Sequence, residues 1–201
     1  MDPRKRVWIY SGLALAAGVG LVVAATPTAS GPQPVAGAPP KPRLGPGSRL
    51  LLVGDSLAQG LAPPLGELAK GLGVAFRADG RQGTRIAQWA SQPWLSADLA
   101  WAPTMVLISL GTNDMKLPQP AVEQPPLGQL AARLKSSGAR VVWLNPPTMP
   151  FPDKGVRQMI AQTGLEVFHS EALPLPRGPD GIHPTVSSYA GWAGALWRWV
   201  G

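Results

Sequence analysis

The chain has 201 residues, a formal net charge of +7 and no cysteine. The lack of cysteine excludes disulfides, a cysteine nucleophile, thiolate metal ligands and an acylated lipoprotein cysteine. More than half of the net charge lies before residue 49, where five basic residues and one acidic residue carry +4. About +3 is left for the remaining 153 positions, too little to indicate a nucleic-acid partner.

The N-terminus combines a basic cluster at residues 4–6 with an uncharged, mostly apolar run at residues 7–25. Nineteen helical residues approach the thickness of a bilayer core, and the preceding basic residues favour a cytoplasmic N-terminus. Residues 1–25 are therefore predicted to be a signal anchor or a cleaved signal peptide, and the length favours the anchor. The remaining chain is then expected in the cell envelope, on the periplasmic side of the inner membrane, or secreted if the leader is cleaved.

Residues 26–48 consist mainly of Pro, Gly, Ala and Thr. This composition cannot form a core, so the segment is predicted to be a disordered linker. The folded domain is expected over residues 49–201.

That domain alternates short β-rich runs with helical stretches. Strands are predicted at 49–53, 73–77, 105–110, 140–144 and 165–168. Helices are predicted at 58–71, in short pieces over 84–101, and at 121–137, 154–163 and 186–200. Steady alternation predicts a three-layer α/β/α, flavodoxin-like fold with a central parallel sheet of about five strands. Pro63 and Pro64 are expected to fray or delay the first helix.

The motif Gly54-Asp55-Ser56-Leu57 directly follows the first predicted strand. Ser56 would lie at the carboxyl end of a parallel strand, where open α/β sheets bind ligands, and at the positive end of a helix dipole. The alternative is that Asp55 or Ser56 simply caps the helix.

Three further polar clusters follow later strands: Ala78 to Thr84, Gly111-Thr112-Asn113-Asp114, and Asp180-Gly181-Ile182-His183. Each alone could be an ordinary turn or cap. Because the carboxyl ends of parallel strands share one edge, the four clusters together predict a common site.

A serine nucleophile needs a base within hydrogen-bond reach. His183 is the candidate, because Asp180 can fold back on its ring from the same turn. The other histidine, His169, has Glu166 three residues earlier on a strand, where the two side chains would point to opposite faces.

These motifs resemble the four blocks of the SGNH hydrolases, the GDSL esterase/lipase superfamily. Gly54 to Leu57 matches the first block, Gly111 to Asp114 the third and Asp180 to His183 the last. Gly83 is the preferred match for the second block, and Gly80 is its competitor.

The resemblance implies a catalytic triad of Ser56, His183 and Asp180. It also implies an oxyanion hole formed by Ser56, Gly83 and Asn113, with no metal and no cofactor.

Asp55 and Asp114 are expected to brace the loops. Two histidines without cysteine also make a zinc site improbable.

The expected reaction is hydrolysis of carboxylic esters through an acyl-enzyme. A small-acyl esterase is favoured, such as an O-acetylesterase on cell-envelope polysaccharide, acting as a monomer on an acylated small molecule or polysaccharide. The alternatives are a lysophospholipase or thioesterase, or a non-catalytic envelope module. Trp89, Trp94 and Trp101 could line a sugar-binding cleft, although a core position is the favoured interpretation.

Overall fold

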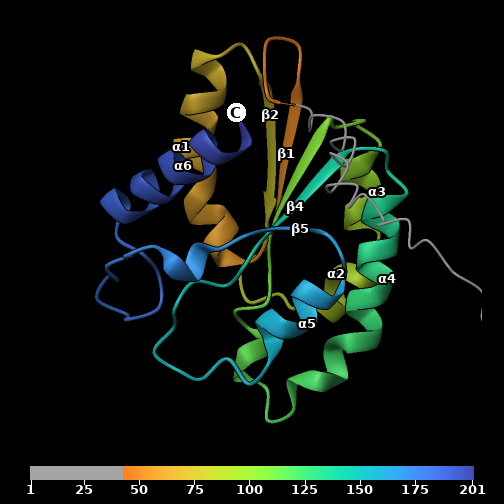
Figure 1. Cartoon of the computed structure of the whole chain (residues 1–201), viewed down its shortest axis with the longest axis vertical. Helices are drawn as coiled ribbons and strands as arrows, with labels where there is room; N and C mark the ends of the chain where they lie inside the picture. The colour runs from red at the N-terminus through yellow and green to blue at the C-terminus, as the bar shows by residue number, and fades with distance from the viewer. Residues whose placement is uncertain (1–42) are drawn as a thin grey trace, which may run out of the picture. The chain divides into compact units, whose positions relative to one another are not determined.

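The computed structural model describes residues 43–201 (Figure 1). Its strands form one parallel sheet in the order β2-β1-β3-β4-β5. The strands are β1 (Arg49–Gly54), β2 (Ala75–Gly80), β3 (Met105–Ser109), β4 (Arg140–Leu144) and β5 (Glu166–Phe168). The predicted fold class, a parallel sheet between two helical layers, is confirmed.

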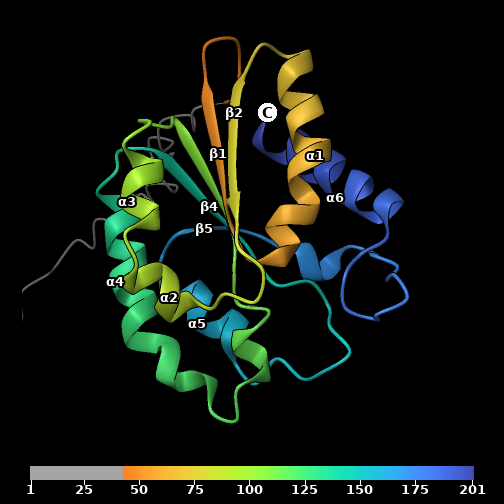
Figure 2. The same cartoon turned by 180° about the vertical axis from the view of Figure 1, so that it is seen from behind.

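Two long helices, α1 (Ser56–Gly71) and α6 (Val186–Val200), pack together on one face of the sheet (Figure 1). The other face carries the remaining α-helices (Figure 2). These are α2 (Ile86–Ser91), α3 (Trp94–Leu99), α4 (Gln124–Lys135) and α5 (Val156–Gln162). Short 3₁₀ turns are η1 (Asp114–Lys116), η2 (Pro120–Glu123) and η3 (Ser170–Ala172).

Side chains of the central strands alternate between two apolar cores. Leu50 and Leu52 join the cluster under α1 and α6, whereas Leu51 and Val53 join the cluster on the opposite face. This period of two is the geometry of a strand, and coverage on both faces explains why β1 is an unbroken apolar run.

Helix α1 corrects the prediction made from its prolines. It begins at Ser56 and continues through Pro63 and Pro64 to Gly71 without the expected delay. A proline inside a helix costs about 3 kcal/mol, but each large apolar side chain that is fully buried contributes about 1.5–3 kcal/mol. The residues of α1 buried against the sheet and α6 are Leu57, Ala58, Leu61, Leu65 and Ala69.

The folded region begins earlier than residue 49. Leu44 is only 7% exposed and belongs to the core under α1 and α6. The Gly47 N–H also donates to the Gly73 carbonyl at 3.3 Å. Leu44 and Gly47 thus contact the folded domain, although they lie within the segment predicted to be a linker.

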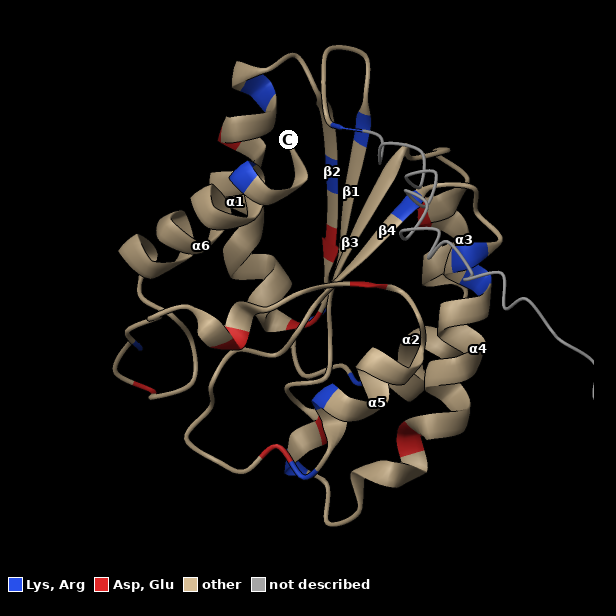
Figure 3. Cartoon of the chain, in the orientation of Figure 1, with Lys and Arg blue, Asp and Glu red and all other residues tan. Residues whose placement is uncertain are grey.

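The predicted N-terminal segment of residues 1–25 and most of the predicted linker lie outside the described residues. Within residues 43–201, no helix has both the length and the apolar character that crossing a bilayer requires. Figure 3 shows basic and acidic positions interspersed over this part of the chain, for example on α1 and β2.

Candidate active site

The carboxyl ends of β1, β2 and β3 lie level with one another. Gly54 is in register with Gly80 on one side and with Ser109 on the other. Backbone bonds continue this alignment into the loops, because Asp55 N–H donates to the Ser109 carbonyl at 3.0 Å and Arg81 N–H to the Gly54 carbonyl at 2.8 Å. The first three predicted motifs therefore begin at one edge of the sheet.

Gly54 is required by the close approach of β1 to β3. Its φ is +154°, and a Cβ at this position would lie 2.1 Å from the Ser109 carbonyl oxygen. Any side chain here would push the two strands apart just before the turn that presents Ser56.

Ser56 is the first residue of α1, and Asp55 is its N-cap. The Asp55 carboxylate accepts the Leu57 N–H at 2.9 Å. As the first helical residue, Ser56 has a backbone N–H without a partner inside the helix. The turn thus offers both a hydroxyl and a backbone donor at the positive end of the helix dipole.

The Ser56 hydroxyl oxygen lies 2.9 Å from Nε2 of His183, across 127 positions of sequence. The other ring nitrogen of His183 lies 2.5 Å from Asp180 Oδ2. The structure therefore brings Ser56, His183 and Asp180 together in one hydrogen-bonded chain.

Asp180 also organises the turn on which it lies. Its Oδ1 accepts the backbone N–H groups of Ile182 and His183, each at 2.9 Å. The hydrogen bond from the His183 ring is the largest cause of a pKa for Asp180 far below the usual range, followed by these backbone donors. Asp180 is therefore ionised at neutral pH, and its side chain is half exposed.

Asn113 connects the two loops that flank Ser56. Its side-chain nitrogen donates to the Thr84 carbonyl at 3.0 Å. Gly83, the residue before Thr84, is exposed with φ +73°, and a Cβ there would meet nothing within 4 Å.

Gly80 occupies a different environment from Gly83. It is the last residue of β2, its carbonyl accepts Gln59 Nε2 at 2.9 Å, and a Cβ would lie 2.6 Å from the Gln59 side chain. The two candidates for the second block thus differ in environment: Gly80 is packed against Gln59, whereas Gly83 lies in an open turn.

The carboxyls of Asp55 and Asp114 are both buried behind this site. Burial is the main cause that raises the pKa of each to about 7. Asp114 Oδ1 accepts the Ile86 N–H at 3.2 Å and so ties the loop after β3 to the start of α2. These contacts are those of loop-bracing residues.

Sequence patterns gave no signal for Glu123, which also braces the start of α2. It is buried, accepts the Ala87 N–H at 2.8 Å and pairs with Arg85 at 3.4 Å. The contact spans 36 positions, so no local motif marks it.

The second histidine has an acidic partner that was not predicted. His169 lies 2.8 Å from Glu171, two residues later, whereas Glu166 pairs with Arg140. The His169 side chain is 70% exposed, and the described structure gives it no contact with Ser56.

The tryptophans divide between core and surface. Trp89 and Trp143 are fully buried, so neither can face a sugar. Trp94 and Trp101 are half buried and carry the guanidinium groups of Arg81 and Arg77 over their rings.

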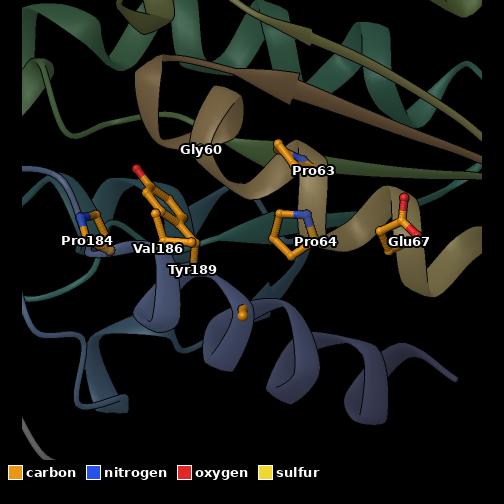
Figure 4. Close-up of a pocket in the computed structure, with 8 residues that line it drawn as sticks. Gly60, Pro63, Pro64, Glu67, Pro184, Val186 and Tyr189 are labelled. Atoms are coloured by element: carbon orange, nitrogen blue, oxygen red, sulfur yellow. The ribbon is translucent and has the colours of Figure 1, made fainter.

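An apolar groove of about 540 Å³ runs between α1 and α6 beside the site (Figure 4). Its lining includes Gly60, Pro64, Val186 and Tyr189, and also Pro184, the residue after His183. Ser56 does not line it, so the groove is separate from the proposed reacting atoms. Within residues 43–201, no group of three potential metal ligands occurs among His, Cys, Asp and Glu.

This architecture, a three-layer parallel α/β sheet with a Ser–His–Asp chain at the carboxyl edge of its strands, is that of an α/β hydrolase-like enzyme. The model of the GDSL-like lipase/acylhydrolase family matches residues 52–190, and the chain belongs to this family. By class it is an esterase. A comparison with curated protein sequences finds no match.

Solved structures with the same fold include three esterases or hydrolases. An acetylxylan esterase from Geobacillus stearothermophilus is 20% identical with a TM-score of 0.61, over 79% of this chain and 96% of that one. An alpha/beta hydrolase enzyme from the metagenome of Lake Arreo is 15% identical with a TM-score of 0.60, over 77% and 95%. A GDSL-like lipase from Bacteroides thetaiotaomicron is 16% identical with a TM-score of 0.58, over 76% and 87%.

Proposed function

We propose that this esterase cleaves carboxylic esters through an acyl-enzyme on Ser56, with His183 as general base and Asp180 as its orienting acid. The observation that carries the proposal is the hydrogen-bonded chain from Ser56 Oγ through both ring nitrogens of His183 to Asp180. A hydroxyl is a weak nucleophile until a base takes its proton. The 2.9 Å between Ser56 Oγ and His183 Nε2 is a hydrogen-bond distance, at which the imidazole can accept that proton.

In the first half-reaction, Ser56 Oγ adds to the ester carbonyl carbon while its proton passes to Nε2 of His183. The π-electron pair of the carbonyl moves to oxygen and forms an oxyanion. Asp180 accepts from Nδ1 and stabilises the imidazolium. When the intermediate collapses, the bond to the alkoxide oxygen breaks and that oxygen takes the proton from Nε2.

In the second half-reaction, water adds to the acyl carbon and gives its proton to His183. Collapse breaks the bond to Ser56 Oγ, which recovers the proton, and the carboxylic acid leaves. No metal or cofactor is needed for either half-reaction.

The oxyanion donors in this proposal are the backbone N–H groups of Ser56 and Gly83 and the side chain of Asn113. A carboxamide has two N–H bonds, so Asn113 can hold the Thr84 carbonyl with one and present the other to the oxyanion. Gly83 is favoured over Gly80 because it lies in the open turn beside Thr84, whereas Gly80 is packed against Gln59.

The proposed substrate carries a small acyl group, as in O-acetylated polysaccharide of the cell envelope. The support is the shared fold with an acetylxylan esterase and a sequence whose residues 7–25 could serve as an anchor or export signal. On this proposal the catalytic domain lies outside the cytoplasm. The apolar groove does not favour a long acyl chain, because Ser56, Gly83 and Asn113 do not line it.

The test is a series of p-nitrophenyl esters from acetate to long-chain acids, hydrolysed by the full chain and by Ser56→Ala. Acetate should be cleaved well above butyrate and longer esters, and Ser56→Ala should be inactive on all of them. A preference for long chains would replace the small-acyl proposal by lysophospholipase or thioesterase activity. Full activity of Ser56→Ala would remove the catalytic proposal itself.

A further inference from the structure

The loop that carries Asp180 and His183 closes on itself. Arg177 and Pro184 form an antiparallel bridge at its base. The Gly178 N–H donates to the His183 carbonyl at 2.7 Å, and the Thr185 N–H donates to the Pro176 carbonyl at 3.0 Å. The loop is a closed unit that continues into α6, and a second contact to the rest of the molecule would further fix its placement over Ser56.

The half-buried side chain of Arg177 provides such a contact. One guanidinium nitrogen, Nη1, donates to the Ile182 carbonyl at 2.7 Å inside the loop. The other, Nη2, donates to the Thr148 carbonyl in the segment between β4 and α5. Arg177 therefore connects the loop to the segment that follows β4.

One of these hydrogen bonds goes to the carbonyl of Ile182, the residue directly before the proposed base, His183. The peptide unit between Ile182 and His183 is held at its carbonyl end by Arg177 and at its N–H end by Asp180, the latter at 2.9 Å. A peptide unit is planar, so holding both ends fixes the plane of this unit and the position of the His183 Cα, from which the ring projects.

The Thr148 anchor is itself held in place. Its hydroxyl donates to the Glu171 carbonyl at 3.2 Å. From the other side, Arg157 donates to the Pro146 and Pro147 carbonyls at 2.8 and 2.9 Å. The segment therefore offers Arg177 a fixed acceptor.

We propose that Arg177 is a positioning residue, which locks the Asp180–His183 loop to the segment after β4 and so aligns the imidazole on Ser56. This inference rests on the proposed function of the triad. Arg177 makes no hydrogen bond to Ser56 or to the ring of His183, and its hydrogen bonds to the loop and to Thr148 go to backbone carbonyls. The planar guanidinium is suited to the task because it presents several donors in a rigid fork, whereas lysine offers one compact ammonium group.

The test compares Arg177→Ala, Arg177→Lys and the control Arg133→Ala in the full chain. Arg133 also donates to backbone carbonyls, those of Trp89 and Ala90, but it touches neither the loop nor Thr148. Arg177→Ala should lower kcat on p-nitrophenyl acetate by about 10- to 100-fold, because a displacement of about 1 Å at a reacting group can cost ~100-fold. KM should change little, and Arg133→Ala should keep the wild-type kcat.

Chemical rescue separates positioning from a general loss of structure. Guanidinium chloride, well below the concentrations that unfold the protein, should restore part of the kcat of Arg177→Ala, and an equal concentration of sodium chloride should not. Arg177→Lys should have an intermediate kcat. If Arg177→Ala does not fold, a lowered kcat in folded Arg177→Lys supports the proposal.

Two outcomes would overturn it. The first is a wild-type kcat in folded Arg177→Ala or, where that variant does not fold, in Arg177→Lys. The second is a loss of activity that merely follows the loss of folded protein and is not rescued by guanidinium. Ser56→Ala, run beside them, distinguishes this failure from that of the proposed function, because an active Ser56→Ala would remove the triad itself.

Discussion

The imidazole of His183 lies 2.9 Å from the hydroxyl of Ser56, although 127 positions separate them. Ser56 is the first residue of α1, and His183 lies three positions before the start of α6. These two helices pack against each other on one face of the sheet (Figure 1). Apolar packing of α1 on α6 therefore brings the two polar side chains together.

Replacement of Asp180 by Asn removes the anion beside His183. We expect kcat to fall by roughly 100- to 10,000-fold, since the acid orients the ring and stabilises the imidazolium. The pKa of Asp180 lies far below its usual range, so the carboxylate is ionised and can act in this way at neutral pH. Steady-state kinetics on folded Asp180→Asn check the loss of kcat; an unchanged kcat would exclude Asp180 as the partner of His183.

Replacement of Asn113 by Ala removes a proposed oxyanion donor. Loss of one such donor typically costs about 2.7–4 kcal/mol of transition-state stabilisation, which corresponds to ~10²–10³-fold in kcat. KM for p-nitrophenyl acetate should change much less, because the charge on oxygen develops only in the transition state. A rise in KM of the same size with unchanged kcat would show that Asn113 stabilises the bound ester substrate and not the transition state.

The two glycines of the loop after β2 should respond differently to alanine. In Gly80→Ala the Cβ would lie 2.6 Å from Gln59, so we expect a stability loss of about 1–3 kcal/mol from overpacking. In Gly83→Ala the space is open but φ is +73°, so the backbone must shift and the proposed donor moves with it. Denaturant unfolding and kcat measured on both variants would test the distinction, which fails if Gly80→Ala has the larger loss of kcat in folded protein.

Asp55 should make the protein less stable as the pH rises. Burial raises its pKa to about 7 from an ordinary value of 3.8, so the folded state binds more protons than the unfolded chain between these values. Its stabilising contribution is complete below pH 3.8 and is lost as the pH rises through about 7, with a slope of up to about 1.4 kcal/mol per pH unit for one proton.

Asp55→Asn retains an oxygen that can accept the Leu57 N–H but cannot ionise. We therefore expect a smaller decline in unfolding free energy from pH 5 to pH 8 than in the wild type, measured by denaturant titration. Asp114, with a pKa also near 7, remains in the variant, so part of the decline should persist. Identical declines in the two proteins would show that Asp55 does not change its protonation on unfolding.

For two elements with strong local signals, the sequence predicted the first and last residues correctly. Strand β4 is a compact apolar run, and α6 follows Thr185, whose side chain caps the helix by accepting the Ser188 N–H. Both have the predicted bounds. Strand β2 was predicted too early and too short because none of its residues is fully buried and its end is set by pairing of Gly80 with Gly54.

Features that depend on distant contacts were not predicted. Leu44 is a lone apolar residue in a segment rich in Pro and Gly, and only the structure shows that it reaches the core. Arg177 contacts Thr148 across 29 positions, and its partners are backbone carbonyls, which leave no mark on the sequence. The candidate triad was accessible to sequence analysis because each of its members lies in a local motif.

The central claim, that His183 activates the hydroxyl of Ser56, is tested most directly by fluorophosphonate labelling of the full chain, with the adduct located by peptide mass mapping. The account predicts an adduct on Ser56 in the wild type and much slower labelling of Ser56 in His183→Ala. A protein that hydrolyses p-nitrophenyl acetate without acquiring an adduct on Ser56, or that is labelled equally fast without His183, would contradict it.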